Sequence, residues 1–274
     1  MDRGKRKIGL TTVLLTLYCI PTIYLVGNTV MASVKTRSDL AQSFFSLPSE
    51  ITFDNFFLVL IEDGFIRYFF NSVMLTSMSL VSLVVVSAML AYGISWYKFK
   101  FNSAFEVFFL FGLMFPIQLG ILPNFVTLRT LGLLNNLFGL VLIYTANLSL
   151  SCFIFSKFFK TLPIELYEAA KIDGAGEFRI FFKIMLPLSK PVIGTVALIS
   201  GVNIWNDFYM PMVFLTRDPV KTMTLGVYRY MSNFMANWDK IFPAVTVVLI
   251  PIIILFVLTS KQLIGGLTSG AIKQ

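Results

Sequence analysis

The sequence predicts an all-α polytopic membrane protein with six transmembrane helices, and three observations lead to this fold class. Hydrophobic residues make up 57% of the 274 positions and charged residues only 13%, whereas a soluble domain carries about a quarter charged residues. Six apolar runs, each long enough to cross a bilayer, alternate with more polar segments. With the N-terminus inside, 14 of the 22 Lys and Arg residues fall on cytoplasmic segments, as the positive-inside rule expects.

The first run follows four basic residues and is longer than the apolar core of a signal peptide, so we interpret it as the first membrane helix. Pro21 lies inside it, which membrane helices tolerate. The chain then divides into an N-terminal helix with an extracytoplasmic loop (1–67), a transmembrane core (68–264) and a cytoplasmic tail (265–274). The predicted spans are 8–31, 68–97, 104–128, 137–159, 187–215 and 241–264.

The composition excludes several kinds of chemistry. The sequence contains no histidine, which removes the commonest metal ligand and acid–base catalyst, so we expect no catalytic and no metal site. Cys19 and Cys152 lie in apolar runs and are predicted to be small buried hydrophobes. No phosphate-binding loop motif occurs, so the chain is not expected to hydrolyse ATP itself. Basic cytoplasmic loops account for the net charge of +8, and no nucleic-acid partner is expected.

A charge-rich segment interrupts the apolar pattern between the fourth and fifth runs. Its first half, 163–176, is predicted to be a short amphipathic helix. Pro163 suits the first helical turn, with Thr161 as a possible cap. Gly174 is expected to end the helix. A second apolar pattern follows and leads into the next span.

This segment resembles a known family. The pattern EAAxxDGAxxxxxFxxIxLPLxxP is met from Glu168 to Pro191 and is similar to the EAA signature of importer ABC permeases, in the form typical of carbohydrate-uptake, maltose-permease-like subunits. The resemblance implies a type I importer core. It also implies that the short helix is a coupling helix that docks on a cytoplasmic ATPase. The residues that would carry the coupling are Glu168, Ala169, Ala170, Asp173, Gly174 and Ala175.

The resemblance further implies the partners and the location of the chain. A second homologous permease, an ATPase dimer and an extracytoplasmic solute-binding protein would complete the importer, in a bacterial inner membrane with both termini cytoplasmic. ATP and magnesium would bind the ATPase, and this chain would bind no cofactor. Its ligands would be a sugar and membrane lipid. Two alternatives stay open: a self-sufficient secondary transporter, which would need inverted repeats and midplane carboxylates, and an ABC permease for another solute.

Two further contacts follow from the same resemblance. The C-terminal tail is small, Gly-rich and nearly uncharged, so we expect it to be flexible and to contact the ATPase dimer through Leu267, Thr268, Gly270 and Lys273. The outer loop 216–240 is long and rich in aromatic residues. It is expected to touch the solute-binding protein through Tyr228, Arg229 and Tyr230.

Ionisable residues are nearly absent from the centres of the apolar runs, which argues against a proton-coupled carrier and favours a neutral polar cargo. Trp205, Phe208 and Tyr209 offer aromatic faces to such a cargo. Hydrogen bonding between helices and an aromatic belt near the membrane interface are the alternative roles for these aromatic residues and for the polar candidates named next. The polar candidates for the substrate path are Asn71, Gln118, Tyr144, Asn147, Asn203, Asn206 and Asp207.

Overall fold

The computed structural model describes residues 9–232 and 237–271, with side chains described as far as residue 258. These residues form helices and no strand, which confirms the predicted all-α class. Among the described residues, three helices are long and apolar enough to cross a membrane, and the number rises to six if each of three bent helix pairs counts as one span. The chain divides into two units, formed by residues 1–66 with 226–249 and by residues 67–225 with 250–274.

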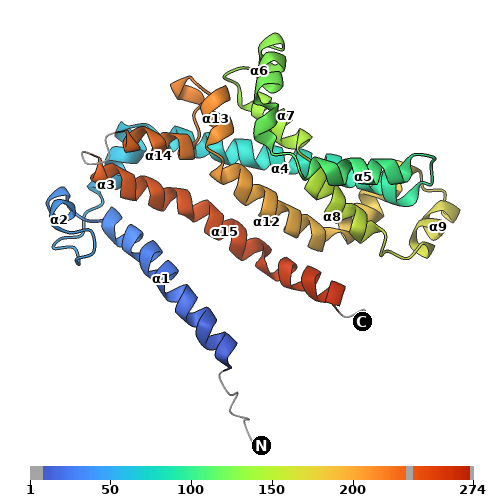
Figure 1. Ribbon diagram of the computed structural model, residues 1–274, viewed down its shortest axis with the longest axis horizontal. Coiled ribbons are helices and arrows are strands. Elements are labelled where there is room, and N and C mark those ends of the chain that lie inside the picture. The colour runs from blue at the N-terminus through green and yellow to red at the C-terminus, as the bar shows by residue number, and fades with distance from the viewer. Residues whose placement is uncertain (1–8, 233–236, 272–274) are drawn as a thin grey trace, which may run out of the picture. The chain divides into compact units, whose positions relative to one another are not determined.

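The first unit begins with the helix that the sequence predicted at 8–31 (Figure 1). Pro21 lies inside this helix without ending it. The unit also holds the first residues of α4, the end of α14 and the first part of α15. Its own helices are α1 (Leu10–Ser33), α2 (Arg37–Gln42), α3 (Asp54–Phe57) and the π-helix η1 (Leu58–Glu62).

A fully buried lysine organises the segment after α1. The Lys35 ammonium donates to the carbonyl oxygens of Ser43 and Phe44 at 3.2 and 3.1 Å. The amide of Asn55 donates to the carbonyl oxygen of Lys35 at 2.7 Å. Because a buried charge must keep its hydrogen bonds, these contacts fix the path of residues 35–55.

The segment 216–240, expected as an outer loop, contains a helix. α14 (Met223–Met231) follows the 3-10 turn η4 (Asp218–Val220). Within the first unit, Asp63 accepts a hydrogen bond from the Tyr230 hydroxyl at 2.9 Å and pairs with Lys240 at 2.8 Å. This carboxylate therefore ties the end of α14 to the start of α15.

The second unit contains most of the predicted core. α5 packs on α8, α8 on α12, and α13 on α7. One apolar cluster gathers around Phe155 and Met185, and another gathers around Leu140 and Phe214. The helices of the unit are α4 (Phe65–Trp96), α5 (Asn102–Gly112), η2 (Ile117–Gly120), α6 (Ile121–Thr130), α7 (Leu137–Ala146), α8 (Ser149–Phe159), α9 (Glu165–Ile172), α10 (Glu177–Ile180), η3 (Phe181–Met185), α11 (Leu186–Leu188), α12 (Lys190–Asn206), α13 (Tyr209–Phe214) and the later part of α15 (Trp238–Ala271).

Three of the predicted spans are broken rather than straight. The run 104–128 bends by 96° between α5 and η2, and the run 137–159 bends by 48° between α7 and α8. The expected span 187–215 is wrong in its bounds: α12 ends at Asn206, and a 74° bend separates it from α10–α11. Proline at position 116 and a polar residue at position 147 explain the first two breaks, because both weaken continuous helical bonding.

The C-terminal residues also differ from expectation. The predicted flexible tail from 265 continues α15 as helix to Ala271. This stretch contains no proline, and glycine lowers helix stability without preventing the helical conformation. Leu267, Thr268 and Gly270 therefore lie on a helical backbone, with side chains outside the described set, and Lys273 lies outside the described residues.

Candidate functional site

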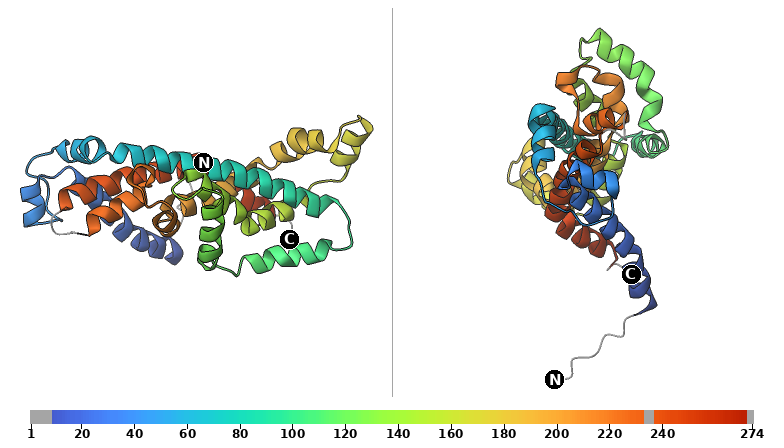
Figure 2. Two further views of the ribbon diagram at one scale, coloured as in Figure 1. Left: turned by 90° about the horizontal axis from the view of Figure 1, so that it is seen from above. Right: turned by 90° about the vertical axis from the view of Figure 1, so that its left-hand side faces the viewer.

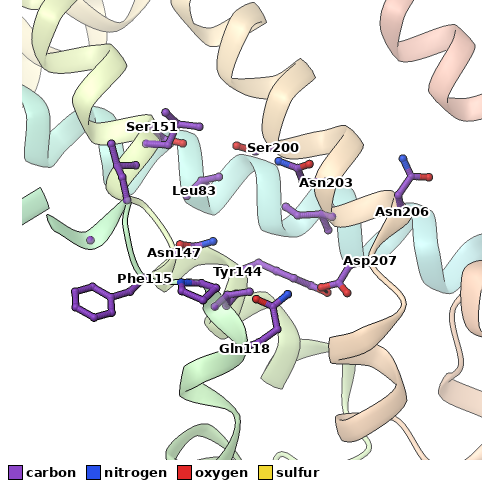
Figure 3. Close-up of a pocket in the computed structure, with 16 residues that line it drawn as sticks. Leu83, Phe115, Gln118, Tyr144, Asn147, Ser151, Ser200, Asn203, Asn206 and Asp207 are labelled. Atoms are coloured by element: carbon purple, nitrogen blue, oxygen red, sulfur yellow. Dashed lines mark hydrogen bonds between the residues drawn. The ribbon is translucent and has the colours of Figure 1, made fainter. Parts of the chain in front are cut away.

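A cavity of about 490 Å³ opens in the second unit (Figure 3). Six of the seven polar residues that the sequence proposed for a substrate path line it, although they come from positions up to 89 residues apart: Gln118, Tyr144, Asn147, Asn203, Asn206 and Asp207. The sequence analysis missed Ser151, Ser200, Leu83 and Phe115. Ser200 was detectable, because it lies three residues before Asn203 on the same helix face.

The cavity lies where helices are interrupted. The break after α5 contributes Leu113, Phe115 and Pro116, and the break after α7 contributes Asn147. The last turn of α12 closes the third side with Asn203 and Asn206. Interrupted helices at membrane depth are tolerated where they line a cavity that satisfies their polar groups. The breaks thus give the site its polar character.

Four carboxamides are free to contact a cargo. The side chains of Gln118, Asn147, Asn203 and Asn206 are exposed at the cavity and form no hydrogen bond within the described part of the chain. In Figure 3, Gln118 comes from η2, Asn147 from the end of α7, and Asn203 and Asn206 from α12. A carboxamide both donates and accepts hydrogen bonds, as recognition of hydroxyl groups requires.

Asp207 and Tyr144 have a structural duty as well. The Tyr144 hydroxyl donates to Asp207 Oδ2 at 2.9 Å. Asp207 Oδ1 accepts the backbone N–H groups of Tyr209 and Met210 at 2.8 and 3.2 Å, which caps the start of α13. The pair therefore joins α7 to the junction between α12 and α13 and holds one wall of the cavity.

The seventh candidate stands apart from the cavity. The Asn71 amide donates to the carbonyl oxygens of Pro219 and Lys221 at 3.0 and 2.9 Å. Asn71 therefore has a structural role: it holds α4 against the segment before α14. Trp205, offered as an aromatic face for cargo, is buried and lines a separate apolar pocket.

The segment predicted to couple to an ATPase forms a short helix, α9, with a glycine-based end. Thr161 does not cap it: its hydroxyl donates to the Phe158 carbonyl, and the helix starts after Pro163. At the other end, Gly174 has a φ of +74°. The backbone N–H groups of Gly174 and Ala175 bond back to Lys171 and Ala170, which is the Schellman arrangement.

The predicted coupling residues fall on two faces of α9 and its following turn. Ala170 is buried and Ala175 half-buried, both against the apolar cluster of Phe155. The side of the segment that faces away from this cluster is exposed at Glu168, Ala169, Asp173 and Gly174. One face thus holds the helix in the unit, and the other is accessible to a partner.

The three residues expected to touch a binding protein also divide by exposure. Tyr228 is exposed, whereas Tyr230 is buried and occupied with Asp63. Phe65 stacks on the Tyr230 ring with centroids 6.2 Å apart. Tyr230 is therefore a structural residue of the first unit, and Tyr228 and Arg229 remain the candidates for contact.

The chain belongs to the binding-protein-dependent transport system inner membrane component family, whose model matches residues 83–264. It is thus a multi-pass inner-membrane permease subunit of an ABC importer. The matched region contains the cavity and the whole of α9.

Particular relatives span nearly the full chain. The present chain is 33% identical to the probable ABC transporter permease protein YurM of Bacillus subtilis, over 99% of this chain and 92% of the relative. It is 31% identical to the diacetylchitobiose uptake system permease protein NgcG of Streptomyces coelicolor, over 98% and 90%.

A solved structure, a bacterial ABC transporter involved in import of the acidic polysaccharide alginate, matches with a TM-score of 0.79 at 24% identity, covering 95% of this chain and 98% of that chain. The likeness shows the fold. A second structure of the alginate transporter, in complex with a periplasmic protein bound to an alginate pentasaccharide, matches with a TM-score of 0.60 at 18% identity. It covers 94% of this chain and 96% of that chain.

Proposed function

We propose that this permease conducts a neutral oligosaccharide through a path that includes the cavity of Figure 3. The gathering of six sequence-proposed polar residues in one space carries the proposal. The relatives named for diacetylchitobiose, arabinooligosaccharides and multiple sugars support the class of cargo.

The charge of the cavity supports a neutral cargo. Among its sixteen lining residues the only charged side chain is Asp207, with no Lys or Arg beside it. An anionic sugar would meet a carboxylate without a counter-charge, in surroundings of low dielectric constant that strengthen the repulsion. Four uncommitted carboxamides instead match the hydroxyl groups of a neutral sugar.

The coupling partners belong to the same proposal. The exposed side of α9 would dock on a cytoplasmic ATPase dimer that binds ATP and magnesium, and a second homologous permease would complete the path. Tyr228 and Arg229 would meet an extracytoplasmic solute-binding protein. Both termini would be cytoplasmic, and the end of α15 with Lys273 would approach the ATPase dimer. The EAA pattern from Glu168 and the basic cytoplasmic segments support this assignment.

Uptake by the reconstituted importer tests the proposal. Proteoliposomes with the full complex and its binding protein are supplied with labelled neutral oligosaccharides and, separately, with an oligosaccharide of uronic acids. We expect ATP-dependent uptake of at least one neutral oligosaccharide and none of the uronate. Asn203→Ala should slow uptake about tenfold, since one hydrogen bond to a cargo is worth about 1 kcal/mol or somewhat more.

Asn124→Ala is the matched control, because it removes the same side-chain atoms from an asparagine that does not line the cavity. It should transport at the unsubstituted rate. Uptake of the uronate, or equal rates for the two alanine variants, would overturn the assignment of the cavity.

A further inference from the structure

One carboxylate fastens the coupling helix to α4. Glu177, the first residue of α10, pairs with Lys171 of α9 at 2.5 Å. It also accepts hydrogen bonds from the hydroxyl groups of Tyr167 and Tyr92 at 2.9 and 3.0 Å. Tyr97 brings a third phenol within interaction range of the same carboxylate. Lys171 and Tyr167 belong to α9, whereas Tyr92 belongs to α4 and Tyr97 follows it directly.

Only a carboxylate fits this set of neighbours. All four groups are hydrogen-bond donors, and an ionised carboxylate offers about four acceptor positions and no donor. A carboxamide would offer half of the acceptors and turn an N–H₂ group toward other donors. The hydrogen bond with Glu177 raises the pKa of Lys171, which agrees with a charged pair. Glu177 is partly exposed, so its ion pair adds little to the stability of the fold. Its main contribution is to fix the position of α9.

The attachment has aromatic support. The Trp96 and Tyr167 rings lie 5.5 Å apart, and Lys171 sits over the Tyr167 ring at 5.5 Å. Tyr92 also contacts Phe181 of η3, with ring centroids 5.6 Å apart. Figure 2 shows α9 and α10 beside the C-terminal end of α4. The attachment of α9 to α4 thus consists of several polar and aromatic contacts centred on the Glu177 carboxylate, rather than one ion pair.

The covalent route from α9 to the cavity is bent. It runs through α10, η3 and α11 and turns by 74° before α12. α4, by contrast, is one unbroken helix from the Glu177 contact to the cavity, where it contributes Leu83. Tyr92 and Leu83 are separated by about 14 Å along the helix axis at 1.5 Å per residue. A rigid element therefore joins the coupling helix to the cavity only if α9 is fixed to α4.

We propose that Glu177 is a positioning residue that locks α9 to the end of α4, so that displacement of the docked coupling helix moves the cavity wall. The inference rests on the proposed ATPase docking of α9. Without the lock, α9 swings on the bend before α12, and ATP hydrolysis is no longer converted fully into transport. The residue contacts neither cargo nor nucleotide in this role.

A distance measurement tests the lock without any transport assay. Spin labels are placed at two exposed positions, Val81 of α4 and Ile172 of α9, after replacement of Cys19 and Cys152 by serine and alanine. The purified permease complex should give one narrow distance distribution. Glu177→Gln should broaden it, because Lys171 and the phenols lose their shared acceptor. An unchanged narrow distribution in this variant overturns the lock.

Transport coupling is the second readout. In proteoliposomes, Glu177→Gln should raise the number of ATP molecules hydrolysed per solute by about threefold or more, within the range observed for residues that couple distant sites. Co-purification of the ATPase should be unchanged. If the label distances broaden and coupling stays normal, the lock exists but transmits nothing, and the inference fails while the proposed function stands.

Two further variants protect the test against misfolding. Tyr167→Phe and Tyr92→Phe each remove one donor and keep the aromatic packing, and each should give a smaller effect in the same direction. Glu106→Gln is the matched control, because Glu106 pairs with Lys160 elsewhere in the second unit. It should change neither distance nor coupling. If the phenylalanine variants equal the unsubstituted protein while Glu177→Gln fails to assemble, Glu177 is needed for folding alone and the inference is wrong.

Discussion

At the scale of single residues, the carboxylate of Asp39 makes the stability of its surrounding segment depend on pH. Its carboxylate accepts the Ser49 hydroxyl at 2.7 Å and the Ser49 N–H at 3.0 Å. These hydrogen bonds hold the pKa of Asp39 below its usual 3.8. Because the pKa of Asp39 is lower in the folded than in the unfolded state, its ionised form stabilises the fold at pH values above the unfolded-state pKa. This contribution is lost as the pH falls through the pKa of the folded state.

The stretch 37–49 should therefore exchange its amide hydrogens faster at pH 3 than at pH 6, after correction for the intrinsic pH dependence of exchange. Asp39→Asn should abolish the difference, because its side chain does not titrate. An equal pH response in that variant would show that another group is responsible.

We expect docking to an ATPase to depend most on Glu168. Its side chain is exposed, and within the described residues no hydrogen bond or ion pair competes with a partner arginine. Glu168→Ala should weaken ATPase binding by about 2–5 kcal/mol, the loss for one partner of a desolvated charge pair. Co-purification of the ATPase measures this, with membrane levels of the permease unchanged. Glu165→Ala removes a neighbouring exposed carboxylate and should have a much smaller effect; equal losses would disprove a specific role.

At the scale of elements, the end of α9 depends on one glycine. Gly174 has a φ of +74°, where a side chain is strained, and a non-glycine residue in this region costs about 1–2 kcal/mol. Gly174→Val should disturb the turn that places α10 and so reduce ATPase co-purification.

Gly176→Val is the control for this substitution. Gly176 has an ordinary φ of −75°, and a Cβ there would meet nothing within 4 Å. Comparable losses for the two valine variants would mean that bulk, rather than backbone conformation, is what the turn rejects.

At the scale of the whole molecule, the last residues should report on the ATPase. Deletion of residues 267–274 removes the end of α15 and the remaining tail, which lie beyond the described side chains. We expect lower transport or ATP hydrolysis without transport, at unchanged membrane levels. Full transport with normal coupling in the truncated protein would reduce this stretch to an ordinary terminus.

The sequence by itself determined the fold class and the family, and it located the apolar runs. Long apolar runs and the asymmetry of basic residues are properties of the sequence itself. They decide directly which segments enter the bilayer and which way they are oriented. The EAA pattern from Glu168 predicted a coupling segment, and Gly174 marked the end of its helix. The polar residues of the cavity were also recognisable, because a carboxamide inside an apolar run is costly unless it has a purpose.

Tertiary structure alone decided which of these residues meet. Asn71 and Asn203 look alike in sequence, yet one holds the segment before α14 and the other faces the cavity. Helix bends cannot be located by hydropathy, because a broken span is as apolar as a straight one. The role of Glu177 was likewise invisible, since its four donors come from α4, the residue after it and α9, up to 85 residues away. Folding brings such partners together, and a carboxylate acquires its function from the donors that then surround it.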